Sequence, residues 1–324
     1  MPENTALLPS SATGIFDLLR AEAADHDLTV QTTAQGLDVS TQYGMISARI
    51  EDRGVRLHLS AEDEGRLAVL RDAVNAHVEG QFALDWNDVR TGHPANLTIL
   101  KVADIYPISP SFLRLSLAGT TDHLAHGGYH VRLIAPGAGK IEWPEIDTTG
   151  RTIWPDNSPL SHRPVYTIAD WRDDSVDIDI FCHDEGRTNT WAATLSVGDP
   201  VGLMGPGGSG LPVATRLSLW GDETALPAIR RILRETSGNA VGSVTIAVHE
   251  PDDISAFDHA GFDVRWIVRN GAADLAQTLI DEGMREADTY LWFAAGSHEV
   301  AIARSFAADH GIGPESRYMA AYWK

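Results

Sequence analysis

The 324-residue sequence contains a single cysteine, Cys182, so it has no second thiol for an internal disulfide. Low cysteine content is typical of proteins from a reducing compartment, and we expect a cytoplasmic location. No apolar run reaches the roughly 18 to 20 residues that a membrane helix needs. The first residues show neither a basic segment nor an apolar signal core. The sequence therefore predicts a soluble protein without a secretory signal.

Positive charge is scarce. The chain has 25 Lys and Arg against 45 Asp and Glu, which gives a formal net charge of −20. Residues 1–92 hold 7 Arg, no Lys and 15 acidic residues (net −8), and the remainder holds the other −12, so the acidity is spread along the chain. Such a surface repels phosphate backbones and anionic lipids, and we expect no nucleic-acid or membrane partner.

Two catalytic signatures are absent from the sequence, namely HExxH and GxSxG. A zinc hydrolase or a serine hydrolase of the elbow type therefore has no support. His123 and His126 flank one loop, but they show no paired metal-ligand spacing, and we do not expect a metal site.

Hydrophobic periodicity divides the chain into three predicted domains. We expect a small α+β domain of unknown role at 1–92, a six-stranded antiparallel β-barrel at 93–212 and a Rossmann-like α/β domain at 213–324. The barrel is indicated by six short runs of alternating character separated by turn residues. The third domain alternates strands with helical patterns, which favours a mainly parallel sheet.

The predicted helices are amphipathic segments with recognisable starts. In the first domain they span about 13–26 and 62–82, with short strands between them. In the third domain they span 224–236, 273–284 and 298–310.

The stretch "GDETALPAIRR" follows an apolar strand that ends at Gly221. Pro227 is tolerated only in the first turn of a helix, so it marks a helix start, with Asp222 or Thr224 as the cap. A strand, a glycine turn and an exposed helix start form the shape that α/β proteins present to nucleotides. "FAAGSHEV" repeats this pattern, with Gly296 leaving room for a ligand and Ser297 capping the next helix.

Taken together, "PVYTIADW", "HDEGRTNTWAATLSVGDPVGLMGPGG", "GDETALPAI", "LWFAAG" and the terminal "YWK" resemble the siderophore-interacting proteins. These are FAD-dependent ferric-siderophore reductases of the ferredoxin-reductase-like group. The resemblance covers about residues 95–324. Residues 10–90 look like a small uncharacterised domain that is sometimes fused ahead of such reductases.

The resemblance implies that Tyr166 stacks on the isoalloxazine ring of FAD and that Thr167 hydrogen-bonds to it. His183 resembles a cofactor-side histidine, and the helix start after Gly186 is a candidate diphosphate seat. The plainer alternatives are an ordinary strand aromatic and an ordinary capped helix. The residues expected to line FAD are Arg163, Tyr166, Thr167, Ile168, His183, Gly186, Arg187, Thr188, Thr190 and Trp191.

The sequence departs from the family pattern around this strand. Arginines usually stand two residues before the tyrosine and often two after the threonine, where this chain has Pro164 and Ala169. Arg163 is offset by one residue and would point to the wrong side of a regular strand, unless Pro164 introduces an irregularity. We propose Arg187 as the source of the missing charge.

The nicotinamide site is expected at the carboxyl edge of the parallel sheet. Tyr322 and Trp323 at the C-terminus either pack the last strand or cover the cofactor cleft. Acidic residues of "VHEPDD" favour NADH, whereas Arg265 and Arg269 would favour NADPH, and the choice stays open. The residues expected at this site are Gly221, Asp222, Thr224, Ala225, Gly296, Tyr322 and Trp323.

We therefore expect an NAD(P)H-dependent flavoprotein that reduces a chelated Fe(III) and so releases Fe(II) for iron assimilation, with ferredoxin as another conceivable donor. Two alternatives remain, a flavin reductase with another acceptor and a siderophore-binding relative that has lost flavin. No side chain is expected to act as a catalytic acid or base. The basic residues expected to hold the anionic chelate are Lys101, Arg114 and Arg132.

Overall fold

The structure is a computed structural model. It describes residues 1–9, 11–25, 28–78, 81–87, 89–125, 128–137, 142–183, 186–208, 210–236, 238–255, 259–269, 275–284 and 288–324. The chain forms two compact units. Unit 1 consists of Met1–Leu100, His123–Arg163 and Pro200–Ser209, and unit 2 consists of Lys101–Asp122, Pro164–Asp199 and Gly210–Lys324. Within the described part of the chain, no helix has both the length and the apolar character needed to cross a membrane.

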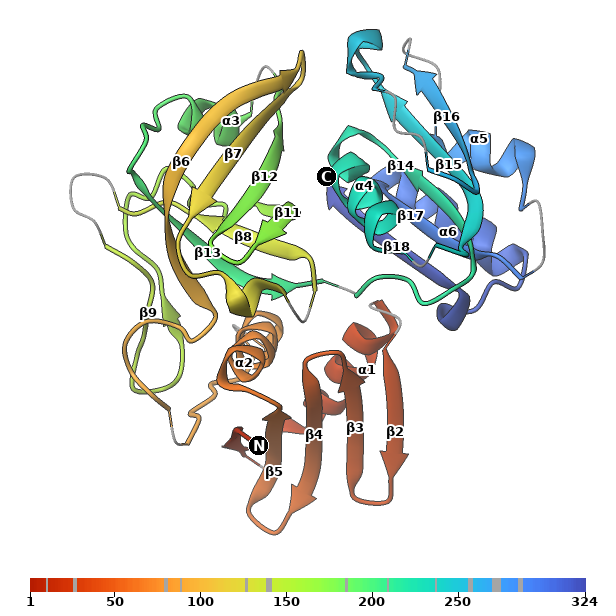
Figure 1. Cartoon of the computed structure of the whole chain (residues 1–324). Coiled ribbons are helices and arrows are strands. Elements are labelled where there is room, and N and C mark those ends of the chain that lie inside the picture. The colour runs from red at the N-terminus through yellow and green to blue at the C-terminus, as the bar shows by residue number, and fades with distance from the viewer. Residues whose placement is uncertain are drawn as a thin grey trace. The chain divides into compact units, whose positions relative to one another are not determined.

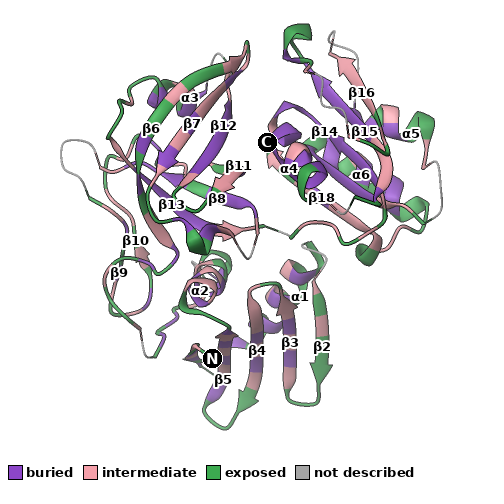
Figure 2. Cartoon of the chain, in the orientation of Figure 1, coloured by how far each residue is buried: buried purple, intermediate pink, exposed green. Residues whose placement is uncertain are grey.

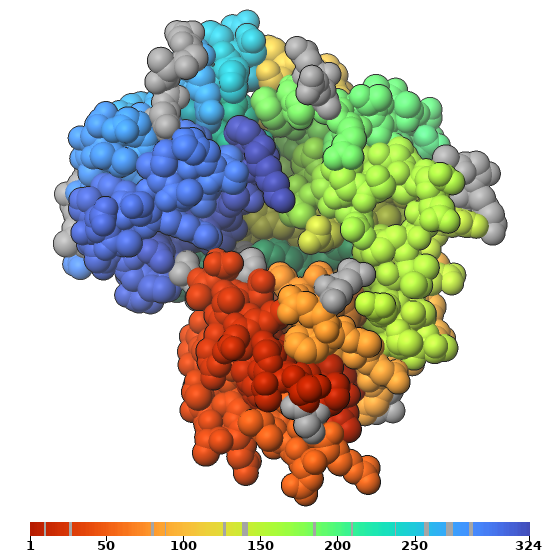
Figure 3. Space-filling view, turned by 180° about the vertical axis from the view of Figure 1, so that it is seen from behind, coloured from red at the N-terminus to blue at the C-terminus, as the bar shows by residue number. Residues whose placement is uncertain are grey.

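The N-terminal region is a five-stranded antiparallel sheet with two helices (Figure 1), which confirms the predicted α+β character and both predicted helices. Its strand order is β1-β5-β4-β3-β2, and Figure 3 shows its residues, in red to orange, as one packed body of side chains. The elements are β1 (Glu3–Leu8), α1 (Ile15–Asp25), β2 (Thr29–Thr33), β3 (Gly36–Thr41), β4 (Gly44–Glu51), β5 (Gly54–Ala61) and α2 (Glu64–Val78).

Alternation along these strands places one face of the sheet in a core with the helices. Leu37, Val39, Leu57 and Leu59 are buried, and they share the core with Leu67 of α2. Their polar neighbours along the strands remain partly exposed, as the alternating colours of Figure 2 show. Strand β1 was not predicted, because "ENTALL" has no β-branched residue besides Thr5.

The six predicted barrel strands are all present. They close in the order β11-β12-β7-β6-β13-β8, which confirms the predicted six-stranded barrel. A two-stranded hairpin, β9 (Glu145–Ile146) and β10 (Thr152–Ile153), lies between β8 and β11 in the sequence. The barrel strands are β6 (Leu97–Ser109), β7 (Phe112–Ala118), β8 (His130–Ile134), β11 (Val165–Arg172), β12 (Ser175–Phe181) and β13 (Pro200–Gly207).

The C-terminal region is a five-stranded sheet in which every strand pair is parallel, in the order β16-β15-β14-β17-β18. Buried residues run along its central strands, as parallel sheets covered on both faces require (Figure 2). The elements are β14 (Arg216–Gly221), α4 (Leu226–Glu235), β15 (Val241–Val248), β16 (Phe262–Val268), α5 (Leu275–Glu282), β17 (Tyr290–Gly296), α6 (Ser297–Asp309) and β18 (Arg317–Trp323).

The helix starts follow the sequence signals closely. Pro227 lies in the first turn of α4, and Leu226, Ile229 and Leu233 form the predicted buried stripe. Helix α4 packs against β14 and against β11, whereas α5 and α6 share a core with Trp220. The helix predicted at 273–284 corresponds to α5, which begins at Leu275. Residues 273 and 274 lie outside the described residues.

Candidate functional site

Tyr166 and Thr167 lie at the start of β11, in unit 2. The Tyr166 hydroxyl is hydrogen-bonded to the side chain of Thr188, and burial raises the pKa of this phenol above its ordinary value. Thr167 is buried, and Ile168 is fully buried and has no exposed surface of its own. The structure therefore brings Tyr166, from the barrel strand, together with Thr188, from the helix that was expected to seat a diphosphate.

A short turn connects β12 to that helix, α3 (Arg187–Ala192). The His183 carbonyl accepts hydrogen bonds from the Gly186 amide at 2.9 Å and from Asn189 Nδ2 at 2.6 Å. A Cβ on Gly186 would stand 2.3 Å from Asn189 Oδ1, so glycine here lets the Asn189 side chain close over the turn. The His183 ring stacks on Phe181, with 6.1 Å between centroids.

No side chain caps α3, which leaves its first turn suited to an anion. The Thr190 hydroxyl donates to the Gly186 carbonyl within the helix, and Trp191 is buried. The exposed Arg187 stands at the first helical position and is the basic side chain of this turn. Asn189, which closes the turn, belongs to the site in addition to the predicted residues.

Arg163 lies in unit 1 and precedes the barrel strand in an irregular backbone conformation. Its φ is +48°, in the left-handed region, so the residue next to Pro164 does depart from a regular strand. Its guanidinium carbon lies 4.3 Å from the centroid of the Trp154 ring, a cation–π contact. Its carbonyl accepts from Arg132 NH1 at 3.4 Å. Trp154 was not predicted as a partner, because the contact depends on the fold of the preceding loop.

The carboxyl edge of the parallel sheet brings together most of the residues predicted for nicotinamide. Asp222 Oδ1 accepts from the amide and from the hydroxyl of Thr224, at 2.9 and 2.5 Å, so Asp222 is the cap. Its Oδ2 accepts from Trp323 Nε1 at 2.7 Å. A Cβ on Gly221 would stand 2.7 Å from Ala225 Cβ, so this glycine allows α4 to start close to β14.

Gly296 lies against Trp323. A Cβ on Gly296 would stand 2.7 Å from Trp323 Cζ2, so the space that glycine leaves is filled by the chain's own indole. The predicted cap role of Ser297 is wrong: Gly296 occupies the cap position, no side chain caps α6, and Ser297 is its first helical residue. The reason is that β17 continues to Gly296, so that the helix begins at Ser297 itself. Tyr322 meets Trp292 edge-on at 6.4 Å and so packs the last strand against β17.

Charged residues beside this edge are already paired. Arg269 NH2 lies 3.4 Å from Glu299 Oε2 and 3.9 Å from Asp222 Oδ2. The His249 ring is hydrogen-bonded to the carboxylate of the buried Glu223. This edge thus carries both signs of charge.

The residues that were weighed for nucleotide choice do not all face this edge. Arg265 forms an ion pair with Glu282. Asp253 is buried, and its Oδ1 accepts from Ser109 Oγ at 2.6 Å and from the Ser111 amide at 3.1 Å. Asp253 therefore joins the β6–β7 turn to the α/β region.

Of the three basic residues predicted for substrate, Arg114 is already paired within its own unit. Arg114 makes a bidentate ion pair with the buried Asp179, at 2.7 and 2.9 Å, and this hydrogen bonding raises the pKa of Arg114. Lys101 is exposed on β6, also in unit 2. Arg132 lies in unit 1.

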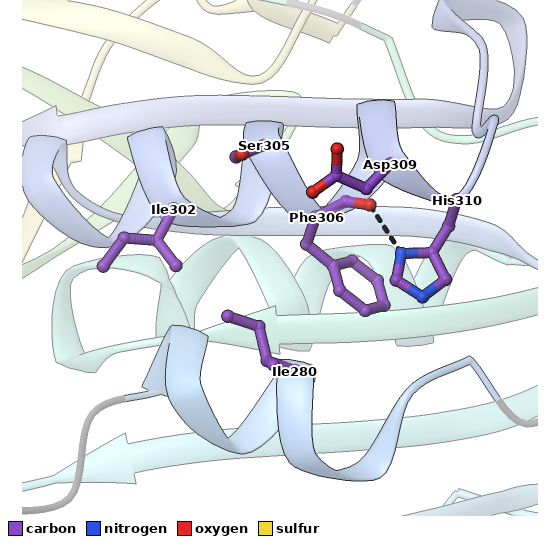
Figure 4. A pocket seen from close by; sticks show the side chains of 6 residues that line it. All are labelled: Ile280, Ile302, Ser305, Phe306, Asp309 and His310. Atoms are coloured by element: carbon purple, nitrogen blue, oxygen red, sulfur yellow. Dashed lines mark hydrogen bonds between the residues drawn. The ribbon is translucent and has the colours of Figure 1, made fainter.

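Two cavities are lined by residues other than Tyr166, Thr188, Asp222 and Trp323. Figure 4 shows one of about 300 Å³ between α5 and α6, where Ile280, Ile302 and Phe306 face one another beside His310. The other, of about 210 Å³, lies over the amino-terminal halves of β14, β15 and β16. Among the described residues no three His, Cys, Asp or Glu side chains gather as metal ligands; His123 contacts Thr98, and His126 lies outside the described residues.

Comparisons with known proteins match most of the chain. Residues 101–210 match the model of the siderophore-interacting FAD-binding domain, and residues 214–324 match the model of the siderophore-interacting protein. The chain is 30% identical over 251 residues to an NADPH-dependent ferric-chelate reductase of Escherichia coli, which covers 73% of this chain and 94% of the relative.

Two further similarities agree with this match. The ferric vibriobactin reductase ViuB of Vibrio cholerae is 29% identical over 238 residues, which covers 67% of this chain and 85% of the relative. Among solved structures, the siderophore-interacting protein SipS of Aeromonas hydrophila is similar with a TM-score of 0.57 at 25% identity. That alignment covers 70% of this chain and 98% of SipS.

Proposed function

Because the chain belongs to the siderophore-interacting protein family and carries its FAD-binding domain, we propose that it transfers electrons from NAD(P)H through FAD to a ferric siderophore. The observation that carries the proposal is the pairing of Tyr166 with Thr188 inside the matched FAD-binding domain. An aromatic ring on a barrel strand then stands beside the uncapped first turn of α3.

The residues present fit a flavin dinucleotide. The partly exposed Tyr166 offers a ring face, and the Thr188 hydroxyl holds its phenol in place. The first turn of α3, with Arg187, would hold the diphosphate. When bound, FAD supplies the conversion of a two-electron hydride donor into single electrons for Fe(III).

The remaining contribution of the protein is to position the nucleotide. In this proposal the nucleotide binds at the carboxyl edge formed by Gly221, Asp222, Thr224, Ala225 and Gly296, and Trp323 covers that edge before the nucleotide enters. No side chain has to act as an acid or a base. We propose the division into domains at 1–92, 93–212 and 213–324, and we place the reaction in the cytoplasm.

The test is anaerobic reduction followed by iron transfer. Protein loaded with FAD is mixed with NADPH or NADH, and flavin bleaching is followed by absorbance. A ferric siderophore is then added with a chromogenic Fe(II) chelator, and two Fe(II) are expected for each nucleotide oxidised. Bleaching without Fe(II) formation would show a flavin reductase with another acceptor. Reduction by ferredoxin but by neither nucleotide would replace the proposed donor.

One observation favours a second candidate, a siderophore-binding relative without turnover. The chain has no arginine at 164 or 169, and the nearby Arg163 is engaged with Trp154. Purified protein that binds a ferric siderophore but takes up no FAD would establish this candidate instead.

A further inference from the structure

Strand β11 has an irregularity immediately after Tyr166 and Thr167. Its register with β12 shifts between Ile168 and Asp170, where Ile168 pairs with Ile178 but Asp170 pairs with Asp177. A bulge of this kind interrupts the ladder and re-aims backbone groups. A buried carbonyl that a bulge turns out of the ladder needs a hydrogen-bond donor from elsewhere in the fold.

Two arginines of α4 provide those partners. Arg231 NH1 donates to the Ile168 carbonyl at 3.0 Å, and Arg234 NH2 donates to the Ala169 carbonyl at 2.8 Å. One turn of one helix thus holds two consecutive carbonyls of the bulge.

The burial of Arg231 shows that this contact has a cost. Its side chain is 6% exposed, and its Nε donates to Glu235 Oε1 at 2.7 Å. A buried guanidinium destabilises a fold unless its N–H groups are hydrogen-bonded and its charge is balanced. A leucine would fill such a position at lower cost, so the hydrogen bond to β11 is a specific feature of this helix. Arg234 is half-exposed and also lies 3.6 Å from Asp170 Oδ1.

The two elements that these arginines join carry the two halves of the proposed site. Tyr166 lies two residues before Ile168 on β11, and α4 begins directly after the turn that Asp222 caps at the end of β14. A shift of β11 against α4 would therefore change the distance between the proposed flavin face and the proposed nucleotide edge. Both elements belong to unit 2.

We propose that Arg231 and Arg234 are positioning residues that hold the Ile168–Ala169 bulge against α4 and so set the separation of the flavin and nicotinamide sites. The effect of these residues on catalysis rests on the proposed function. The hydrogen bonds between α4 and β11 do not depend on any cofactor.

The hydrogen bonds between α4 and β11 are tested first without cofactor, by hydrogen exchange of the β11 amides in FAD-free protein. Arg231→Met and Arg234→Ala are expected to raise exchange across 165–172 by about ten-fold or more, because the bulge loses its partners. Arg234→Lys keeps one donor and is expected to restore most of the protection. The matched control is Arg304→Met, since Arg304 of α6 also donates to a strand carbonyl, that of Met319. This control should leave the exchange of β11 unchanged.

Unchanged β11 exchange in the Arg231 and Arg234 variants would overturn the proposal. If Arg231→Met does not fold, the variants of the half-exposed Arg234 decide the test.

The consequence is tested in FAD-loaded protein by stopped-flow reduction with NAD(P)H. A displacement of roughly 1 Å at a reacting centre can cost about 100-fold in rate. We expect Arg234→Ala to lower the flavin reduction rate by about ten-fold, with the FAD Kd and the nucleotide KM within about three-fold of wild type. Wild-type rates in Arg234→Ala would overturn the positioning role. If the wild-type protein itself binds no FAD or is not reduced, the proposed function fails, while the exchange experiment still decides whether the arginines hold β11.

Discussion

The indole of Trp323, the penultimate residue, donates a hydrogen bond of 2.7 Å to the buried Asp222 carboxylate at the end of β14. The other oxygen of Asp222 caps the turn that starts α4. One carboxylate therefore joins β14 and β18, which are the first and the last strands of the parallel sheet in chain order. The half-exposed Trp323 lies over the edge where we propose that nucleotide binds.

Replacing Trp323 by Phe tests this bond. The variant keeps an aromatic ring over Gly296 but leaves Asp222 Oδ2 without its indole donor, and a buried acceptor that loses its partner costs about 1–3 kcal/mol. We expect a drop of that size in the free energy of unfolding, measured by urea denaturation. Tyr322→Phe, which alters the neighbouring aromatic, is the comparison variant. A Trp323→Phe protein as stable as wild type would show that the bond contributes nothing.

Replacing Gly296 by Ala tests the close contact beneath the indole. The new Cβ would stand 2.7 Å from Trp323 Cζ2, so the ring has to move and its bond to Asp222 is lost. We expect destabilisation by about 1–3 kcal/mol in wild type. In a Trp323→Ala background the same substitution should be nearly neutral, since the clash is gone. Equal effects in the two backgrounds of this double-mutant cycle would contradict the contact.

Replacing Arg114 by Met tests whether its charge serves the fold. Asp179 has a side chain 1% exposed and would lose its bidentate partner. Breaking a buried ion pair from one side typically costs about 3–5 kcal/mol, and we expect a loss of that order. The double variant Arg114→Met with Asp179→Leu should recover much of it. Lys101→Met, on the exposed surface of β6, should change stability by less than about 0.5 kcal/mol. The denaturation midpoints of the three variants measure these effects. A small loss of stability in Arg114→Met would return Arg114 to the candidates for substrate binding.

The alkaline limit of stability is expected to depend on Tyr318. Burial raises the pKa of this phenol from 10.0 to about 12, and its ring stacks on Trp292. A raised folded-state pKa gives stability that is complete below the unfolded pKa of about 10 and is lost as pH rises through about 12. The expected loss between those limits is about 2–3 kcal/mol. Urea denaturation from pH 9 to 11.5 should show a steeper decline for wild type than for Tyr318→Phe, and equal slopes would refute the assignment.

The sequence predicted the elements well because the patterns that define them are local. Period-two runs bounded by turn residues indicated all six barrel strands, and Pro227 located the start of α4. The failures involve contacts between distant segments. The bulge after Ile168, the stacking of Arg163 on Trp154 and the ion pair of Arg114 with Asp179 join residues whose proximity no local pattern encodes. The contact between Gly296 and Trp323 is of the same kind. The sequence indicated that Gly296 leaves room for another group, but it did not indicate that this group is the Trp323 indole.

The most direct measurement of the central claim is a titration of the flavin-free protein with FAD, followed by flavin fluorescence, for wild type, Tyr166→Phe and Tyr166→Ala. We predict one FAD per chain with a Kd of about 1 μM or tighter for wild type. Tyr166→Phe keeps the ring face and should stay within about five-fold, while Tyr166→Ala should lose about ten-fold or more, because stacking on an aromatic is worth about 0.5–1.5 kcal/mol beyond the area it buries. Saturable binding that is indifferent to Tyr166→Ala, or no binding at about 100 μM FAD, would contradict the account.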